Sequence, residues 1–552
     1  MGATLRDPLA RTLFLLTGSA SLALTGCVAG PDFVRPPPPP TPAYTAQAVP
    51  PVTVASEGPA GVPQYFLQGQ DLPAGWWHWF GSPAIVTLVE RGFANSQTLA
   101  AARARLRGAE AQLRAQRGVL LPEVGGTGSF NYGGGGAQGA RQRAGSSGGA
   151  VTPTPTPTPT PGESGADPGG GSEGAGGSGD AFTIYTVGAS ITYDLDLAGR
   201  NRRLVEAAAA AYDQQAQELQ AAYLALVGNI VSAALEGASL RAQIDAREEL
   251  LAAQAERLEL LRIRVAEGED ARADLVTQEA DIAALRATVP PLRAQAAAAQ
   301  NRLALLIGVP PAEAAIPAIA LDDLQLPQAV PISLPSTLVR RRPDILAAEA
   351  VLAGASAQIG VAAADLYPNL TLDAAFGLAG GASGLALVAP EPVFDLNANL
   401  LAPLFDGGRR RAARDAAVAV YQESLALYRE QVLTAFTEVA DGIRALESNA
   451  DALAQQRIAL GAAGESLELA QFRLDEGAVS IIDVLTVQQV YQDARFAYIQ
   501  AIADRFQSTA ALFAALGPGP LTQGQVAGIT AREYLDGTRA ALMDGRVPEK
   551  GL

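Results

Sequence analysis

Few side chains in this sequence could take part in chemistry. The 552 residues include a single histidine, His78, and a single cysteine, Cys27. Such a composition excludes a disulfide framework and any metal cluster built from histidine and cysteine. His78 stands among the aromatic residues of 76–80, where a lone histidine is expected to pack or lie at an interface rather than bind a ligand. Acidic residues are plentiful but scattered, and no nucleophile–base pair or phosphate loop is found, so we expect no enzyme and no cofactor.

Two acids nevertheless occupy equivalent places. Asp274 and Asp483 lie six residues beyond Gly268 and Gly477, respectively. An acid at that point would stabilise the first turn of a helix by facing the positive end of its dipole. The equivalence extends further, because residues 257–308 align without a gap on residues 466–517 at an offset of 209.

Each aligned copy predicts an apolar-periodic helix that breaks at a Glu-Gly pair, restarts, and stops at a glycine. This is a helix–turn–helix tip, made twice in one chain. The matching tip residues are Arg264, Glu267 and Gly268 in the first copy, and Arg473, Glu476 and Gly477 in the second. The glycines would contribute to a well-capped turn whatever the tips do.

Net charge and hydropathy limit the partners of the chain. The formal net charge of −16 argues against a nucleic-acid partner, which requires a basic surface. No long apolar run follows the N-terminus, so we expect no spanning helix. A membrane role would require strands or an anchor.

The N-terminus predicts such an anchor. Residues 1–26 have the layout of a secretory signal, and Leu24-Thr25-Gly26-Cys27 resembles a bacterial lipobox. Cys27 would then carry acyl and diacylglyceryl lipid. By resemblance to known lipoproteins, Val28 in place of Asp favours sorting to the outer membrane. Residues 27–70 would follow as the acylated N-terminus and a Pro-rich tether, extended over 35–63.

Four segments alternate between apolar and polar residues with a period of two: 123–132, 185–194, 369–378 and 393–400. This pattern is typical of outer-membrane barrel strands. Four strands cannot close a barrel, and open edges are not tolerated in lipid, so several copies of the chain must combine. The insertion at 133–181 is rich in Gly, Ser and Thr-Pro repeats, and is expected to be a disordered surface loop.

Helical periodicity fills most of the remainder. We expect helices over 83–119 and 336–366, and two very long helices over 199–266 and 408–475, each followed by a return helix of about 35 residues. Such lengths imply coiled-coil packing. The predicted divisions are a first repeat over 71–308, a connector over 309–335, a second repeat over 336–517 and a C-terminal tail over 518–552.

Several motifs resemble those of one family. They are GPDFVRP at 30–36, GWWHWFGSP at 75–83, LPSTLVRRRPDILAAE at 334–349, IGVAAADLYPNLTL at 359–372 and PLFDGGR at 403–409. Together with the two tips they resemble the outer-membrane efflux lipoproteins, the OprM/NodT branch of the TolC family. The likeness runs from Cys27 to about Gly517 and omits only the long loop. Taken alone, Arg340–Arg342 before Pro343-Asp344 could be a solvated helix start or an interface pairing.

The resemblance implies a mixed α and β membrane protein. Its fold would be a trimeric, twelve-stranded outer-membrane β-barrel, with four strands per protomer, continued by a long periplasmic α-helical coiled-coil barrel with two internal repeats. The homotrimer would be a passive exit duct in outer-membrane lipid. Its tips would dock a periplasmic adaptor (a membrane fusion protein) connected to an inner-membrane transporter of the resistance–nodulation–division (RND) type.

For the sites, the resemblance implies that Asp483, and by symmetry Asp274, lines the pore gate. A ring of carboxylates at a constriction favours cations. Arg264, Glu267, Gly268, Arg473, Glu476 and Gly477 would contact the adaptor. Two alternatives stay open: a duct for polypeptides paired with an ATP-driven type I secretion system, and a periplasmic adaptor, against which the paired tips and four alternating segments argue.

Overall fold

The computed structural model describes residues 28–134, 181–383 and 386–517, in two compact units. The sheet unit comprises residues up to 30, 115–203 and 360–413. The helical unit comprises 31–114, 204–359 and the residues from 414 onward. Cys27, the signal segment 1–26, nearly all of the loop 133–181 and the tail 518–552 lie outside the described residues.

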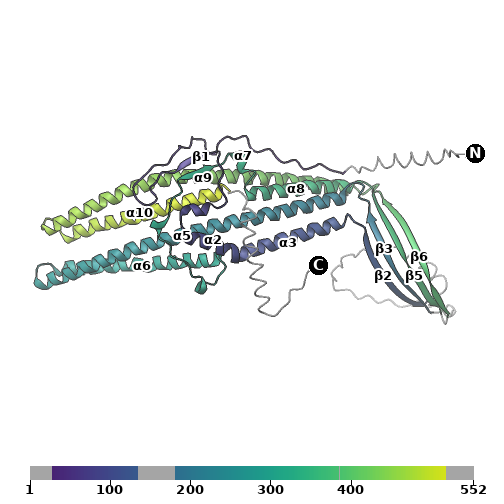
Figure 1. Cartoon of the computed structure of the whole chain (residues 1–552), viewed down its shortest axis with the longest axis horizontal. Helices are drawn as coiled ribbons and strands as arrows, with labels where there is room; N and C mark the ends of the chain where they lie inside the picture. Colours follow the sequence, from purple (N-terminus) through teal and green to yellow (C-terminus); the bar gives the residue numbers. More distant parts are fainter. Residues whose placement is uncertain (1–27, 135–180, 384–385, 518–552) are drawn as a thin grey trace, which may run out of the picture. The chain divides into compact units, whose positions relative to one another are not determined.

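The sheet unit contains one antiparallel sheet (Figure 1). Its strands, in spatial order, are β2 (Glu123–Gly134), β3 (Ala181–Asp194), β5 (Asn369–Ser383) and β6 (Ala386–Leu401). All four alternating segments of the sequence are therefore strands, each at least as long as predicted. Strands β2 and β6 form the two edges, and their outer backbone groups have no partner strand in the described chain.

The register gathers the large apolar side chains on one face of this sheet. Phe376 pairs with Phe394 on one side and with Ala189 on the other, and Val124 pairs with Ile191. Phe394 is 85% exposed, so nothing in the described chain covers this face. The same face carries Val124, Phe130, Tyr132, Val187, Ile191, Leu372, Phe376, Leu378, Leu396 and Leu400, all of them exposed. An uncovered apolar face of this extent is what a strand layer presents to lipid.

The opposite face of the sheet is polar. It carries residues such as Thr127, Ser129 and Asn131, and Thr192 donates a hydrogen bond to Asp373 Oδ1 at 2.9 Å between β3 and β5. Polar side chains on the second face are expected when that face borders water.

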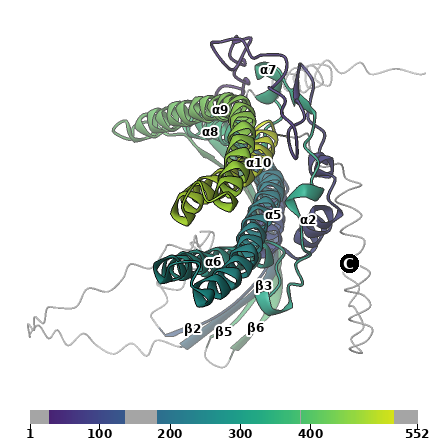
Figure 2. The same cartoon turned by 90° about the vertical axis from the view of Figure 1, so that its left-hand side faces the viewer.

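The helical unit is built on two antiparallel hairpins (Figure 1 and Figure 2). In the first, α5 (Arg200–Glu267, 68 residues) turns into α6 (Arg272–Leu306, 35 residues). In the second, α9 (Arg409–Asp475, 67 residues) turns into α10 (Ile481–Ala515, 35 residues). The long helices and their returns agree with the sequence prediction, including the near-equal lengths in the two halves.

Two predicted helices are each divided into two. The region 83–119 forms α2 (Pro83–Asn95) and α3 (Gln97–Gly118), because Ser96 between them takes an extended backbone with ψ of 120°. Arg103 donates to the Phe93 carbonyl at 3.3 Å and so satisfies an acceptor at the end of α2. The region 336–366 forms α7 (Pro335–Leu338) and α8 (Pro343–Ala364), because Pro343 cannot continue a helix but can begin one.

The N-terminal segment is not the free tether that its composition predicts. Strand β1 (Tyr65–Gln68) pairs in parallel with β4 (Ala329–Ile332) of the connector. The Gln64 side chain is fully buried and donates to the Pro327 carbonyl at 2.9 Å, and Tyr44 donates to the Ser333 carbonyl at 2.9 Å. Proline-rich composition fixed an extended backbone, but the apolar and amide side chains between the prolines pack against the unit.

Aromatic side chains form the centre of the helical unit. The short helix η1 (Trp76–Phe80) packs Trp76 edge-on against Phe513 of α10, with ring centroids 5.7 Å apart. Phe506 of α10 and Ile230 of α5 are fully buried in the same core. Burial of each such side chain contributes about 1.5–3 kcal/mol. The connector adds the short helices η2 (Pro311–Glu313) and η3 (Leu321–Asp323).

By length and composition alone, α5 and α8 each contain a stretch apolar enough to cross a membrane. About half of each stretch is buried within the protein, as in the core helices of soluble proteins. Their apolar character is therefore weak evidence for a spanning helix.

Candidate functional site

Both hairpin tips end their long helix in the same way. Gly268 and Gly477 take positive φ values of 84° and 70°. After α5, the N–H of Glu269 donates to the Arg264 carbonyl at 2.9 Å, and after α9 the N–H of Ala478 donates to the Arg473 carbonyl at 2.8 Å. These bonds form a Schellman cap, which requires a left-handed residue and so favours glycine. The Glu-Gly pairs of the sequence thus mark the turns.

The two return helices begin differently. Ser480 caps α10: its hydroxyl accepts from the Asp483 N–H at 3.3 Å, while Asp483 Oδ2 accepts from the Ser480 N–H at 2.9 Å. This reciprocal arrangement is a capping box. The Ser480 hydroxyl also donates to Asp483 Oδ2 at 2.7 Å. The side-chain bond and then the backbone bond from Ser480 hold the pKa of the exposed Asp483 carboxyl below its ordinary value.

Asp274 has no such cap partner. Ala271 occupies the N-cap position of α6 and offers no side-chain hydrogen bond. Asp274 lies in the first turn and is half-buried, and its backbone N–H donates to the Ala271 carbonyl at 3.1 Å. Its carboxylate accepts no hydrogen bond from the residues that the structure describes. The structure therefore places both aspartates at equivalent helix starts, but their carboxylates have different surroundings.

The charged residues of the tips also differ. Arg264 forms an ion pair with Asp270, with Nε 2.9 Å from Oδ2. Arg473, its equivalent, is exposed, and no ion pair to it is found among the residues that the structure describes. Glu267 and Glu476 are both exposed beside their glycines. The second tip thus exposes Arg473 and Glu476 to solvent, and Arg473 has no ion-pair partner among the described residues.

A layer of buried glutamines lies behind the tips and has no counterpart in the sequence prediction. Gln254, Gln278, Gln488 and Gln492 are each at most 9% exposed. Gln278 donates to Gln254 Oε1 at 2.5 Å, but the Oε1 atoms of Gln278 and Gln488 have no hydrogen-bond partner in the described protein. A cavity of about 640 Å³ adjoins the layer and is lined from both hairpins. From the sequence, glutamines in amphipathic helices are expected at the surface. The burial of these four glutamines is therefore visible only in the tertiary structure.

Arg342 is the second feature that the sequence left undecided. Its side chain is 10% exposed and forms ion pairs with Asp344 at 2.7 Å and Glu438 of α9 at 2.6 Å. It also donates to the Ala515 carbonyl of α10 at 2.9 Å. Burial opposes ionisation of Asp344, but the hydrogen bonds and charge of Arg342 outweigh it and keep the pKa of Asp344 below its ordinary value. Arg342 is therefore paired within the chain and is not a solvated residue at a helix start.

His78 is exposed and stacks on Trp77, with ring centroids 5.6 Å apart. It lies in no group of metal-ligating side chains within the described ranges. Its surroundings agree with the packing role expected from the sequence.

The comparisons with known proteins agree with this architecture. The outer membrane efflux protein family matches residues 88–309 and 334–518. The pyoverdine export outer membrane protein OpmQ of Pseudomonas aeruginosa is 32% identical over 444 residues, covering 80% of this chain and 87% of OpmQ. The toluene efflux pump outer membrane protein TtgC of Pseudomonas putida is 29% identical, covering 90% of this chain and 95% of TtgC.

Among solved structures, the outer-membrane channel OprN superposes with a TM-score of 0.73 at 26% identity. That match covers 89% of this chain and 99% of OprN. On the strength of the matched residues, the strand layer and the paired hairpins, this chain belongs to the outer membrane efflux protein family.

Proposed function

We propose that this chain is the exit duct of a tripartite efflux pump of the RND type, through which drugs or other small toxic compounds pass passively from the periplasm to the exterior. The observation that carries the proposal is the four-stranded sheet. It has one uncovered apolar face and two open edges, so it must meet lipid and further strands.

Three copies would close this sheet into a twelve-stranded barrel and remove every edge. The hairpins of the three copies would form the periplasmic tunnel. Asp274 and Asp483 would then face the pore as rings of carboxylates, and the exposed residues of the tips, among them Arg473 and Glu476, would contact the adaptor. Cys27 would carry the lipid that anchors the N-terminus.

The alternative is the duct of an ATP-driven system that secretes polypeptides. The relative TtgC is named for the efflux of toluene, a small molecule. By analogy, this favours small molecules as the cargo of this chain. The motifs that resemble those of the efflux lipoproteins, among them residues 334–349, favour the same conclusion.

Capture of the partner at the tip tests the proposal. Val479 lies at the second tip, half-buried, one residue before the cap Ser480. With Cys27 blocked by lipid, Val479→Cys would carry the one reactive thiol of the chain. We expect crosslinking in living cells, followed by mass spectrometry, to identify an adaptor of an RND-type drug or solvent pump. Ala416→Cys, exposed on α9 and about 90 Å from the tip along the helix, is the matched control and should capture no adaptor.

An adaptor of an ATP-driven exporter at Val479→Cys would move the assignment to polypeptide secretion. Products only between copies of this chain would support the trimer but remove the support for docking. The anchor is tested separately: Cys27→Ser should abolish incorporation of labelled palmitate, and persistent labelling would contradict the lipid site.

A further inference from the structure

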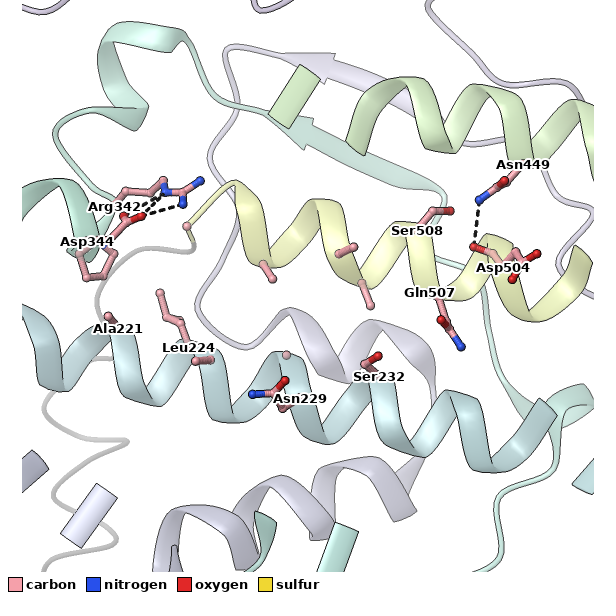
Figure 3. Close-up of a pocket in the computed structure, with 17 residues that line it drawn as sticks. Ala221, Leu224, Asn229, Ser232, Arg342, Asp344, Asn449, Asp504, Gln507 and Ser508 are labelled. Atoms are coloured by element: carbon pink, nitrogen blue, oxygen red, sulfur yellow. Dashed lines mark hydrogen bonds and ion pairs between the residues drawn. The ribbon is translucent and has the colours of Figure 1, made fainter. Parts of the chain in front are cut away.

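A second cavity, of about 630 Å³, lies within the helical unit between α5 and α10, beside the start of α8 (Figure 3). Its volume falls in the range of about 300–1,000 Å³ that small-molecule sites occupy. None of the tip or gate residues discussed above lines it. It is therefore separate from the predicted docking and gating sites.

The floor of this cavity is small and apolar. Ala225 and Gly228 of α5 face Ala511 and Ala514 of α10. A Cβ added at Gly228 would lie 3.6 Å from the Cβ of Ala514, so the helices are already in contact there. The missing side-chain volume leaves a shallow surface that could accept a flat ring or an alkyl group.

At one end of the cavity, the charge of Arg342 is already offset by carboxylates. Its guanidinium is bonded to Asp344, Glu438 and the Ala515 carbonyl, as described above. Two carboxylates against one guanidinium leave a formal charge of −1 in this cluster. An anionic ligand would be repelled there.

At the other end, Asp504 of α10 offers a second carboxylate. It is half-buried and accepts a hydrogen bond from Gln500 Nε2 at 2.7 Å. No basic side chain pairs with it among the described residues. Figure 3 shows Asp504, Gln507 and Ser508 along α10, with Asn229 and Ser232 on the facing turns of α5. The polar end is thus rich in hydrogen-bonding groups and carries net negative charge.

We propose that this cavity binds amphipathic organic cations, with the apolar body on the alanine floor and the cationic group near Asp504. The inference rests on the proposed function, since it makes the cavity a transient station for cargo in the duct and names the class of that cargo. A cationic group gains attraction from Asp504 and from the excess carboxylate near Arg342, and a neutral or anionic compound of the same shape does not.

Two probes of similar size and opposite charge test the proposal. Benzyltrimethylammonium and benzenesulfonate would be titrated, by equilibrium dialysis, against the full chain in nanodiscs of zwitterionic lipid, with empty discs as the blank. We expect saturable binding of the cation and no saturable binding of the anion. Asp504→Asn, which preserves shape, should weaken cation binding by up to about fivefold, the upper end of the range for one solvent-screened ion pair. Ala511→Phe should fill the floor and abolish binding.

Asp493→Asn is the matched control, because Asp493 is an exposed carboxylate on the same helix outside the cavity and bonds only to Gln489 in the described chain. It should bind the cation as the unmodified chain does. Equal binding of the two probes, or an unchanged affinity in Asp504→Asn, would overturn the site even if Ala511→Phe failed to fold. The dialysis experiment requires neither the adaptor nor transport. A failure of the crosslinking at Val479→Cys would therefore count against the proposed duct function but would leave the binding of cations in this cavity to be decided by dialysis.

Discussion

Asp483 has one role that the structure shows and one that we propose. Its carboxylate closes the capping box with Ser480 and remains exposed, so the structural role does not remove it from the predicted gate. Asp274 has no cap partner, so its charge has no comparable part in holding the helix start. The two aspartates are equivalent in sequence position but not in local energetics.

The capping box predicts a pH dependence at the second tip. Because the folded pKa of Asp483 is depressed, its contribution to tip stability is present above its ordinary value of about 3.9 and is lost as the pH falls through the lower folded value. We expect Asp483→Asn to speed amide exchange over 480–484 at pH 6, and the difference from the unmodified chain to vanish at low pH. Asp274→Asn, measured over 271–275, should show a smaller effect. A difference in Asp483→Asn that grows in acid would contradict this account.

Glycine at the tips gives a second prediction. A Cβ at Gly268 or Gly477 would meet no atom within 4 Å, so replacement by alanine tests the backbone conformation alone. We expect Gly268→Ala and Gly477→Ala each to cost about 1 kcal/mol, since alanine is strained at positive φ. Gly108→Ala, in the exposed interior of α3 and equally free of contacts, should stabilise by about 0.5–1 kcal/mol. Local amide exchange would measure all three.

At the scale of elements, the two hairpins differ in cohesion along their length. Around η1 they share an apolar core with aromatic side chains, including Trp76 and Phe513. Behind the tips they meet through the glutamine layer and its cavity. Buried amide groups without partners cost free energy, so this second contact holds the hairpins together less strongly.

Removing the unsatisfied acceptor of Gln488 should therefore stabilise the contact. An orphaned buried acceptor costs about 1–3 kcal/mol, and leucine has a similar length without the acceptor. We expect Gln488→Leu to raise the thermal midpoint and slow amide exchange in the first half of α10. Gln278 is kept, because its side chain donates to the buried Oε1 of Gln254 and its loss would leave that acceptor unpaired. Gln489→Leu, exposed and bonded to Asp493, should change neither. A lower midpoint in Gln488→Leu would contradict this account.

At the scale of the whole molecule, the sheet decides the assembly. Within the part of the chain that the structure describes, the outer edges of β2 and β6 have no partner strand and one face of the sheet is apolar. The exposed apolar face is unfavourable in water, and the unpaired backbone groups at the edges are unfavourable in lipid. We expect the chain to fractionate with the outer membrane and to migrate as a heat-labile trimer in unheated samples. A stable monomer in that fraction would contradict the closed barrel.

The sequence by itself determined the order and kind of the main elements. Period-two alternation marked all four strands, and the Glu-Gly pairs marked both tips, because face alternation and a left-handed cap are local requirements written in adjacent residues. The motifs at 334–349 and 359–372 already indicated the family. The family match then covered residues 88–309 and 334–518.

Only the tertiary structure decided which polar residues are inside. Gln254, Gln278, Arg342 and Gln64 have the composition of surface residues, and each is buried because a distant segment packs over it. The position of the N-terminal segment was also decided by the tertiary structure. Its prolines predicted a tether, but its strand β1 pairs with β4 of the connector. Contacts between residues that lie far apart in the chain leave no periodic trace in either segment, so local patterns could not reveal them.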